Sequence, residues 1–231
     1  MIYNFNMKNI NITLPNGKVF SVLSGTTALE LLNEFDKSDS PIVAVLINNK
    51  IRSLQEKLIY NAIISPIYLN SKEGCQVYRR TLCFLLAAAA HKIFPKRRLL
   101  VGHSLGHGYY YTLEDGNPLQ EDDIFQLKTE MQNLINQDCC ISQDEISYTD
   151  AQILFNELNL VESQKQLNYI CPPSFKINKL ADFSDIYYGP LLHTTKLLQA
   201  FDIMKYGDGF LLRFPNSTDH SKLVDFEDVP K

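Results

Sequence analysis

The spacing of hydrophobic residues predicts one long helix near the middle of the chain. Neither Gly nor Pro interrupts residues 75–94, Gly74 precedes them and Pro95 ends them. Apolar side chains recur at helical intervals in this segment, at Leu82, Leu85, Leu86, Ala89 and Ile93. After a basic turn, residues 99–101 and 109–113 are typical of strands separated by a glycine-containing loop. We therefore expect a buried helix followed by two strands.

The pattern before this helix predicts a small sheet with one helix. Strands are expected at 9–14, 19–23, 42–47, 51–54 and 65–69, and a helix at 27–35. Asn16-Gly17 favours a type I′ turn, because both residues tolerate positive φ. Thr27 and Glu30 have the spacing of a capping box at the helix start. A hairpin, a helix and further strands follow the order of a β-grasp fold.

The remainder of the chain mixes helices and strands. Helices are predicted at 120–137, 150–159 and 161–169, and strands at 139–148, 175–177, 183–188, 197–205 and 210–214. Thr149 is the expected N-cap of the second of these helices. The fold class is therefore α+β. We expect a β-grasp domain at 8–70, a larger α+β domain at 72–215 and a polar tail or linker at 216–231.

Charge is distributed unevenly along the chain. The net charge of −4 does not suggest a general nucleic-acid binder. Residues 72–98 nevertheless carry seven Lys or Arg against Glu73, and residues 115–162 carry eleven Asp or Glu against Lys128. The favoured interpretation is two solvated faces that attract each other. The alternative is a phosphate-contacting patch made of Arg79, Arg80, Lys92, Lys96, Arg97 and Arg98.

Cysteine usage and hydropathy predict a cytoplasmic protein. The five cysteines are an odd number without a C-x-x-C pair, which favours free thiols in a reducing compartment. The chain starts without the basic and apolar regions of a signal peptide. The longest apolar run, Leu82–Ala90, is far shorter than the ~20 residues of a membrane helix. We expect a soluble protein with no membrane partner.

Two motifs in the loop at 102–108 suggest chemistry that their context does not favour. Residues 102–106 match G-x-S-x-G, but a hydrolase elbow needs a helix after the serine, and strand-like residues follow here. His103 and His107 are four residues apart, but the neighbouring glycines argue against a helix that would align them. Loop histidines beside a shallow groove are the preferred interpretation. A zinc site completed by Cys139 or Cys140 stays open.

The segment EGCQVYRRTLCFLLAAAAHKIFP resembles the start of the second additional, or editing, domain of threonyl-tRNA synthetase. That family shows a Tyr-Arg-His turn, a His-x-x-x-His pair, an Ala-rich helix and a Phe-Pro stop; here Arg80 and Phe84 occupy the two His positions. Asp185–Thr195 is similar to the family's Asp-Leu-Cys-x-Gly-Pro-His-x-x-x-Thr segment, with Tyr187 at the Cys position and Leu191 at the His position. The part before residue 73 resembles the TGS domain that precedes the editing domain.

The resemblance implies a non-catalytic role. Without its four ligand positions, the editing-type pocket is expected to hold no metal and to hydrolyse no mischarged tRNA. TGS and editing-like regions also precede the P-loop kinase domain of uridine-kinase-like proteins, so we expect an N-terminal accessory region of such a nucleoside kinase. This chain has no P-loop, so it is not expected to be an enzyme by itself, and ATP and Mg are expected only if a kinase domain follows. The alternatives are a stand-alone tRNA- or RNA-binding module and a small-molecule sensor.

The resemblance also places a candidate cleft. The expected ligand-binding residues are Arg80, Phe84, His103, Ser104, His107, Tyr109, Tyr187, Tyr188 and His193. A forked guanidinium at Arg80 suits a phosphate or carboxylate, and the tyrosines offer aromatic faces to a nucleotide ring. The ligand would be a small anion or a nucleotide. The alternative is an inert remnant that only packs against a kinase domain.

Overall fold

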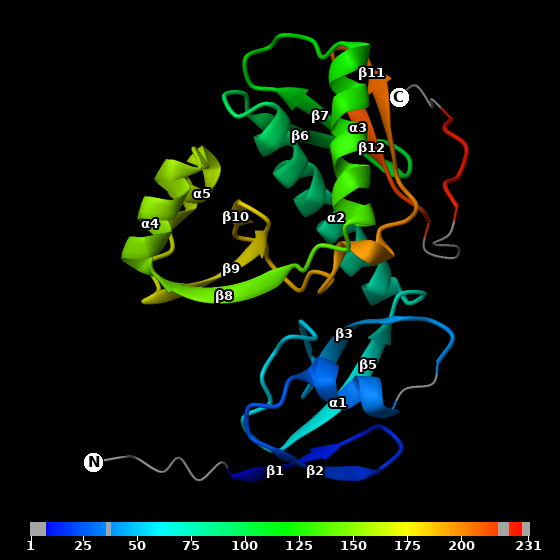
Figure 1. Cartoon of the computed structure of the whole chain (residues 1–231), viewed down its shortest axis with the longest axis vertical. Helices are drawn as coiled ribbons and strands as arrows, with labels where there is room; N and C mark the ends of the chain where they lie inside the picture. Colours follow the sequence, from blue (N-terminus) through cyan, green and yellow to red (C-terminus); the bar gives the residue numbers. More distant parts are fainter. Residues whose placement is uncertain (1–7, 36–37, 217–221, 228–231) are drawn as a thin grey trace.

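The computed structural model describes residues 8–35, 38–216 and 222–227. Its first part is a five-stranded sheet in the order β2-β1-β5-β3-β4, with one helix packed on it (Figure 1). The elements are β1 (Asn9–Thr13), β2 (Val19–Leu23), α1 (Ala28–Phe35), β3 (Ile42–Ile47), β4 (Lys50–Arg52) and β5 (Ala62–Tyr68). β1 and β5 are parallel and central, as a β-grasp fold requires. The expected fold class is confirmed.

The turn between β1 and β2 differs from the prediction. Thr13 pairs with Val19, so five residues connect the strands. Gly17 has φ of 80° and its N–H donates to the Leu14 carbonyl over 2.9 Å, while Asn16 is not at positive φ. The type I′ turn predicted at Asn16-Gly17 is therefore wrong, because Pro15 in second position favours an ordinary turn. Positive φ values at two successive residues occur instead at Asn48 and Asn49, between β3 and β4.

Helix α2 (Lys72–Ile93) is the central helix of the larger part of the molecule. Ser71 caps it, because its Oγ accepts the Gly74 N–H over 3.0 Å. The helix is covered on most sides, by α3 (Glu121–Asn136) and by a sheet in the order β11-β12-β7-β6 (Figure 1). These strands are β6 (Leu99–Ser104), β7 (Gly108–Leu113), β11 (Asp202–Tyr206) and β12 (Gly209–Arg213). Val43, Ala44 and Ile67 of the first part pack into the same hydrophobic cluster as α2.

A third group of elements forms an arm beside this core. It consists of the sheet β10-β9-β8 with two helices, whose bounds are β8 (Ser142–Ser147), α4 (Tyr148–Glu157), α5 (Val161–Leu167), β9 (Ser174–Leu180) and β10 (Phe183–Asp185). The buried side chains of Ala151, Phe155, Leu167 and Ile177 give the arm its own small core. The cap of α4 is Ser147, whose Oγ accepts the Asp150 N–H, so the prediction of Thr149 is wrong by two residues.

The strand predicted at 197–205 is mostly irregular. A 3₁₀ turn covers Thr195–Leu197, and β11 begins only at Asp202. The reason lies in α2: the Tyr78 hydroxyl donates to the Ala200 carbonyl over 2.8 Å and accepts the Ala200 N–H over 3.0 Å. One buried phenol thus replaces a strand partner for this backbone. Its burial raises the pKa of Tyr78 to about 12.

Two further expectations concern the termini and the surface. Of the polar tail predicted at 216–231, the structure describes only residues 216 and 222–227, and the rest lies outside the described residues. Among the helices of the described part, none combines the length and the apolar character needed to cross a bilayer. All five cysteines are free thiols.

Candidate functional site

A cavity of about 720 Å³ lies where α2 faces the arm. Helical spacing places Cys83, Ala87, His91 and Phe94 along one wall, since residues three or four apart share a helix face. β6 and β7 supply the second wall, and the 158–163 turn between α4 and α5 supplies the third. Phe183, Asp185 and Tyr187 close the cavity from the end of β10 and the residues after it.

The predicted site residues do not all meet in this cavity. Tyr109 and Tyr187 line it. Tyr188 lines a second, smaller cavity. His103, Ser104 and His107 are exposed at the end of the β6–β7 hairpin, so the loop predicted to approach a ligand points its polar side chains at solvent. Arg80, Phe84 and His193 do not line the cavity either.

Arg80 packs against the chain rather than against a cavity. Its Nη1 donates to the Pro190 carbonyl over 2.9 Å. Its Cζ lies 2.9 Å from where a Cβ on Gly189 would stand, and Gly189 has φ of 99°. Burial lowers the pKa of the Arg80 guanidinium, with the nearby Cys83 and Tyr109 opposing this. The partner of Arg80 is therefore a backbone carbonyl and not an acidic side chain.

Phe84 and Tyr187 fill the space between α2 and the segment after β10. Phe84 is fully buried, and its ring meets Tyr187 edge-on at 5.1 Å between centroids and Phe183 at 5.5 Å. Burial raises the pKa of Tyr187 well above its usual range. Its phenol therefore stays protonated at neutral pH and cannot act as a base.

The fourth substituted position, Leu191, is buried in the core at 3% exposure. The next residue is fixed to α2, because the Leu192 N–H donates to Thr81 Oγ1 over 2.9 Å. Thr81 in turn donates to the Val77 carbonyl. The part of the second motif around Leu191 is thus held on α2 by hydrogen bonds and apolar packing.

His193 lies on the far side of this segment, beside the start of β8. Its carbonyl accepts the Ile141 N–H, and its Nδ1 is buried with no hydrogen-bond partner among the described residues. Burial lowers the pKa of His193, and Asp138 opposes the effect. Within the part of the chain that the structure covers, no three His, Cys, Asp or Glu side chains come together at metal-binding spacing.

The cavity holds polar groups that sequence reasoning missed. Asp185 accepts the Ser163 hydroxyl over 2.6 Å and the Ile186 N–H over 2.7 Å, and burial raises its pKa. Cys83 interacts with the Tyr111 hydroxyl, and burial raises the pKa of both groups. Asp185 opens the motif that carries the resemblance, and Tyr111 follows Tyr109 in strand alternation. Those two signals could have identified them.

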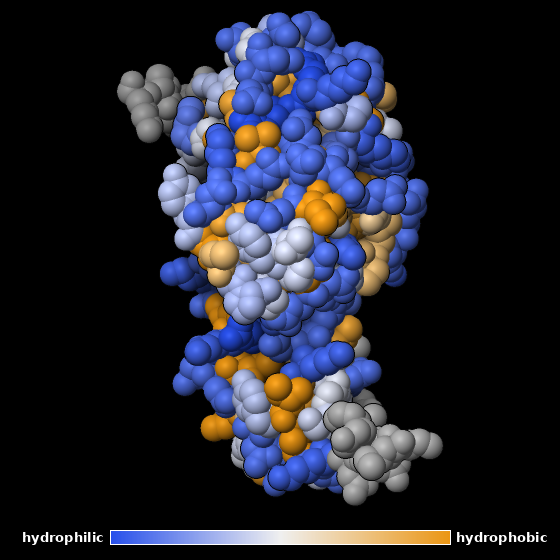
Figure 2. Space-filling model, turned by 90° about the vertical axis from the view of Figure 1, so that its left-hand side faces the viewer, coloured by the Kyte–Doolittle hydropathy of each residue, from blue (hydrophilic) through white to orange (hydrophobic). Residues whose placement is uncertain are grey.

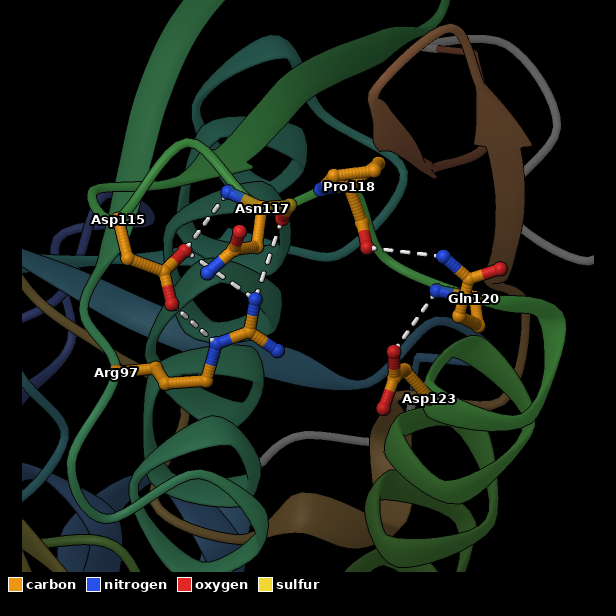
Figure 3. A network of polar contacts seen from close by, with 6 residues as sticks. All are labelled: Arg97, Asp115, Asn117, Pro118, Gln120 and Asp123. Atoms are coloured by element: carbon orange, nitrogen blue, oxygen red, sulfur yellow. Dashed lines mark hydrogen bonds and ion pairs between the residues drawn. The ribbon is translucent and has the colours of Figure 1, made fainter.

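Three of the seven cations in the basic segment 72–98 pair with acidic side chains. Lys92 Nζ lies 2.7 Å from Glu130 Oε1, and Arg98 Nη2 lies 2.6 Å from Glu114 Oε1. Arg97 forks onto Asp115, with its Nε 2.7 Å from Oδ2, and it also donates to the Asn117 carbonyl (Figure 3). This is the attraction between two charged faces that the favoured interpretation predicts. It also leaves fewer free cations for a phosphate-contacting patch.

Comparison with known proteins bears on the family. No protein-family model matches the chain. Threonine–tRNA ligase 2 of Bacillus subtilis (strain 168) is 29% identical over 207 residues, which are 88% of this chain and 32% of the relative. The chain is related to threonine–tRNA ligases. The enzymes of Lawsonia intracellularis and Desulforamulus reducens are each 26% identical, over 81% and 87% of the chain. The chain spans about a third of the length of these curated relatives.

Proposed function

We propose that this chain is a binding module that accepts the 3′ end of a tRNA in the 720 Å³ cavity. It does not hydrolyse the ester bond between the tRNA and its amino acid. One observation carries the proposal. A sizeable cavity stays open beside Tyr187, one of the four positions where the resembling family keeps its ligands, although the side chains at all four positions are occupied in packing. The chain thus keeps space for a ligand next to a position whose catalytic group has been replaced.

The replaced side chains do not fit a metal or a general base. A guanidinium remains protonated, so Arg80 offers no lone pair. Phe84 and Leu191 have no donor atoms, and the raised pKa of Tyr187 keeps its phenol protonated. The donor set needed to bind zinc or to activate a water is absent from these four positions. These four side chains therefore supply no group for a hydrolytic step.

The cavity walls suit a nucleoside with polar edges. Tyr109 and Tyr187 offer aromatic surface, and Phe94 and Leu160 add apolar contact. Asp185 is the buried acceptor, and burial raises the pKa of its carboxyl group. The relatives are threonine–tRNA ligases, whose names identify tRNA as their substrate. That similarity supports an RNA end over an unrelated small molecule.

The test is a binding assay with an acceptor-stem RNA that ends in CCA. We expect saturable binding that weakens when the terminal adenosine is removed, and no protein-dependent loss of the amino acid from mischarged RNA. Val161 lines the cavity, so Val161→Phe should weaken binding roughly tenfold, the effect of ~1.4 kcal/mol. Ile153→Phe adds the same ring on the exposed face of α4 and should change nothing.

Two outcomes would contradict this function. Equal binding by Val161→Phe and by the unaltered protein would remove the cavity from RNA recognition. Deacylation that follows protein concentration and is lost in Tyr187→Phe would show that hydrolysis survives. Either result can be read without ambiguity if the unfolding midpoints of the variants match that of the parent.

A second candidate follows from the two-part layout. The first part has the strand order of a β-grasp, the fold of the TGS domain that the sequence resembles, and the second has lost the editing ligands. We infer from these features that an accessory region of a uridine-kinase-like protein is the main alternative, with a nucleoside in the same cavity. The reading frame distinguishes the two: a P-loop after Lys231 supports the kinase setting, and a ligase catalytic region supports the first.

A further inference from the structure

A second cavity, of about 300 Å³, lies at the waist between the β-grasp part and the arm. Figure 2 faces this side of the molecule and shows hydrophobic surface above and below the narrow waist. The walls of this second cavity are the end of β4 and the residues that follow, the start of β9, and the segment 186–190. Neither part encloses the space alone, and ligand pockets commonly form between such parts.

Large apolar side chains are exposed around its mouth. Ile51, Ile170 and Tyr188 line the cavity and are 37%, 46% and 66% exposed. Tyr169, next to Ile170, is 90% exposed. A single exposed apolar side chain is ordinary on a protein surface, but several at one opening indicate a binding surface. These four side chains come from three different segments of the chain, so it is folding that brings them together.

One cation at this mouth has no counter-ion among the residues that the structure describes. Two basic side chains, Arg52 and Lys176, and one acidic side chain, Glu56, line the cavity. Lys176 Nζ lies 2.9 Å from Glu56 Oε2, so these two neutralise each other across the two parts. Arg52 is exposed, and within residues 8–35, 38–216 and 222–227 its side chain has neither an ion pair nor a hydrogen bond. The cavity therefore presents one uncompensated, forked donor, which suits a phosphate.

The aromatic wall is held in place. The Tyr188 hydroxyl donates to Gln166 Oε1 of α5 over 3.3 Å. On its other side the chain turns at Gly189, and Pro190 is tied to α2 through Arg80. A ring that is fixed at its hydroxyl and half open to solvent gives a flat ligand a face to stack on at little cost in side-chain entropy.

We propose that the waist cavity binds a single nucleotide, with its base against Tyr188 and Ile51 and its phosphate on Arg52. The volume is at the lower end for ligand pockets, which fits one nucleotide better than a longer chain. This site is separate from the 720 Å³ cavity, and Tyr187 is the wall that both share. The uncompensated charge favours this ligand over an apolar peptide.

The test is calorimetric titration with ribonucleoside 5′-monophosphates, the matching nucleosides and inorganic phosphate. We expect the monophosphates to bind tightest. Arg52→Ala should weaken them roughly tenfold or more and leave the nucleosides unchanged, because it removes a charged hydrogen-bond partner of the phosphate. The matched control is Lys50→Ala, an exposed cation of the same strand that does not line the cavity. Tyr188→Leu should weaken monophosphates and nucleosides alike, and Tyr188→Phe much less.

The outcomes separate this site from the RNA site. Monophosphate binding that survives Val161→Phe and is lost in Arg52→Ala supports the waist cavity, whether or not the larger cavity binds RNA. Equal binding by Arg52→Ala and by the unaltered protein overturns the proposal. So does failure of every monophosphate to bind, or capture of an extended peptide by the same rim in its place. Arg52 is exposed, so its replacement should leave the unfolding midpoint unchanged.

Discussion

At the residue scale, the four positions that hold ligand side chains in the resembling family hold side chains that serve packing in this chain. The loss of imidazole and thiolate groups at Arg80, Phe84, Tyr187 and Leu191 can be predicted from the sequence, because it depends only on residue type. The partner of Arg80 cannot be predicted in this way. It is the Pro190 carbonyl, and its position depends on the left-handed turn at Gly189. For that reason the sequence predicts a charged donor in a cleft where the structure places a cross-link between α2 and the segment after β10.

This cross-link predicts a cost for a side chain at Gly189. Gly189→Ala should lower the free energy of unfolding by about 1–3 kcal/mol, because φ of 99° is strained for alanine and its Cβ would meet the Arg80 guanidinium. Urea unfolding measures this change. Gly25→Ala is the matched control, since Gly25 has φ of 100° but its Cβ would meet nothing within 4 Å. An equal cost in both variants would show that the contact with Arg80 contributes nothing.

At the scale of elements, the sequence predicts segments whose partners are local and misplaces those that a distant side chain completes. The helix α1 and the strands β2 and β3 begin and end where the pattern indicates, or within a residue. The segment before β11 does not, because the Tyr78 hydroxyl satisfies the backbone of Ala200 from 122 positions away. The predicted site residues are divided between two cavities for a similar reason. Tyr187 and Tyr188 are adjacent in sequence, yet Tyr188 lines only the waist cavity.

The link between the end of α2 and the turn after β7 predicts a pH dependence. The hydrogen bond from Arg97 lowers the pKa of Asp115 from 3.8 to about 2. A carboxylate with a depressed pKa stabilises the fold above its unfolded pKa and loses that contribution as pH falls through the folded pKa. Asp115→Asn should therefore be less stable than the parent at pH 6, and the difference should shrink between pH 4 and pH 2.

Urea midpoints across this pH range measure the difference. The control is Asp182→Asn, which changes the same charge at an exposed position with no ion pair in the part of the chain that the structure describes. Its midpoint should stay parallel to that of the parent. If Asp115→Asn also stays parallel to the parent down to pH 2, the ion pair with Arg97 does not contribute to folding. Because both partners are partly open to solvent, with side chains 26% and 36% exposed, high salt should reduce the effect as well.

At the scale of the whole molecule, the β-grasp part and the arm are joined by polar contacts that no local pattern indicates. Gln55 follows β4, and both polar atoms of its side-chain amide form hydrogen bonds with the backbone at the start of β8. Its Nε2 donates to the Ile141 carbonyl over 2.8 Å, and its Oε1 accepts the Gln143 N–H over 3.2 Å. A glutamine amide thus takes the place of a neighbouring strand at this edge. The Glu56–Lys176 ion pair lies beside it, so the waist cavity depends on this contact for its shape.

Gln55→Ala should therefore loosen the two parts from each other while each keeps its own core. Removal of two hydrogen bonds should cost about 1–3 kcal/mol, and amides of β4 and β8 should exchange with solvent faster than those of α2. Gln76→Ala, on an exposed position of α2, is the matched control and should leave exchange unchanged. Because Arg52 and Tyr188 sit on opposite sides of the waist, Gln55→Ala should also weaken nucleotide binding without altering either side chain. Unchanged exchange at β4 and β8 would mean that apolar packing of Val43, Ala44 and Ile67 against α2 fixes the two parts by itself.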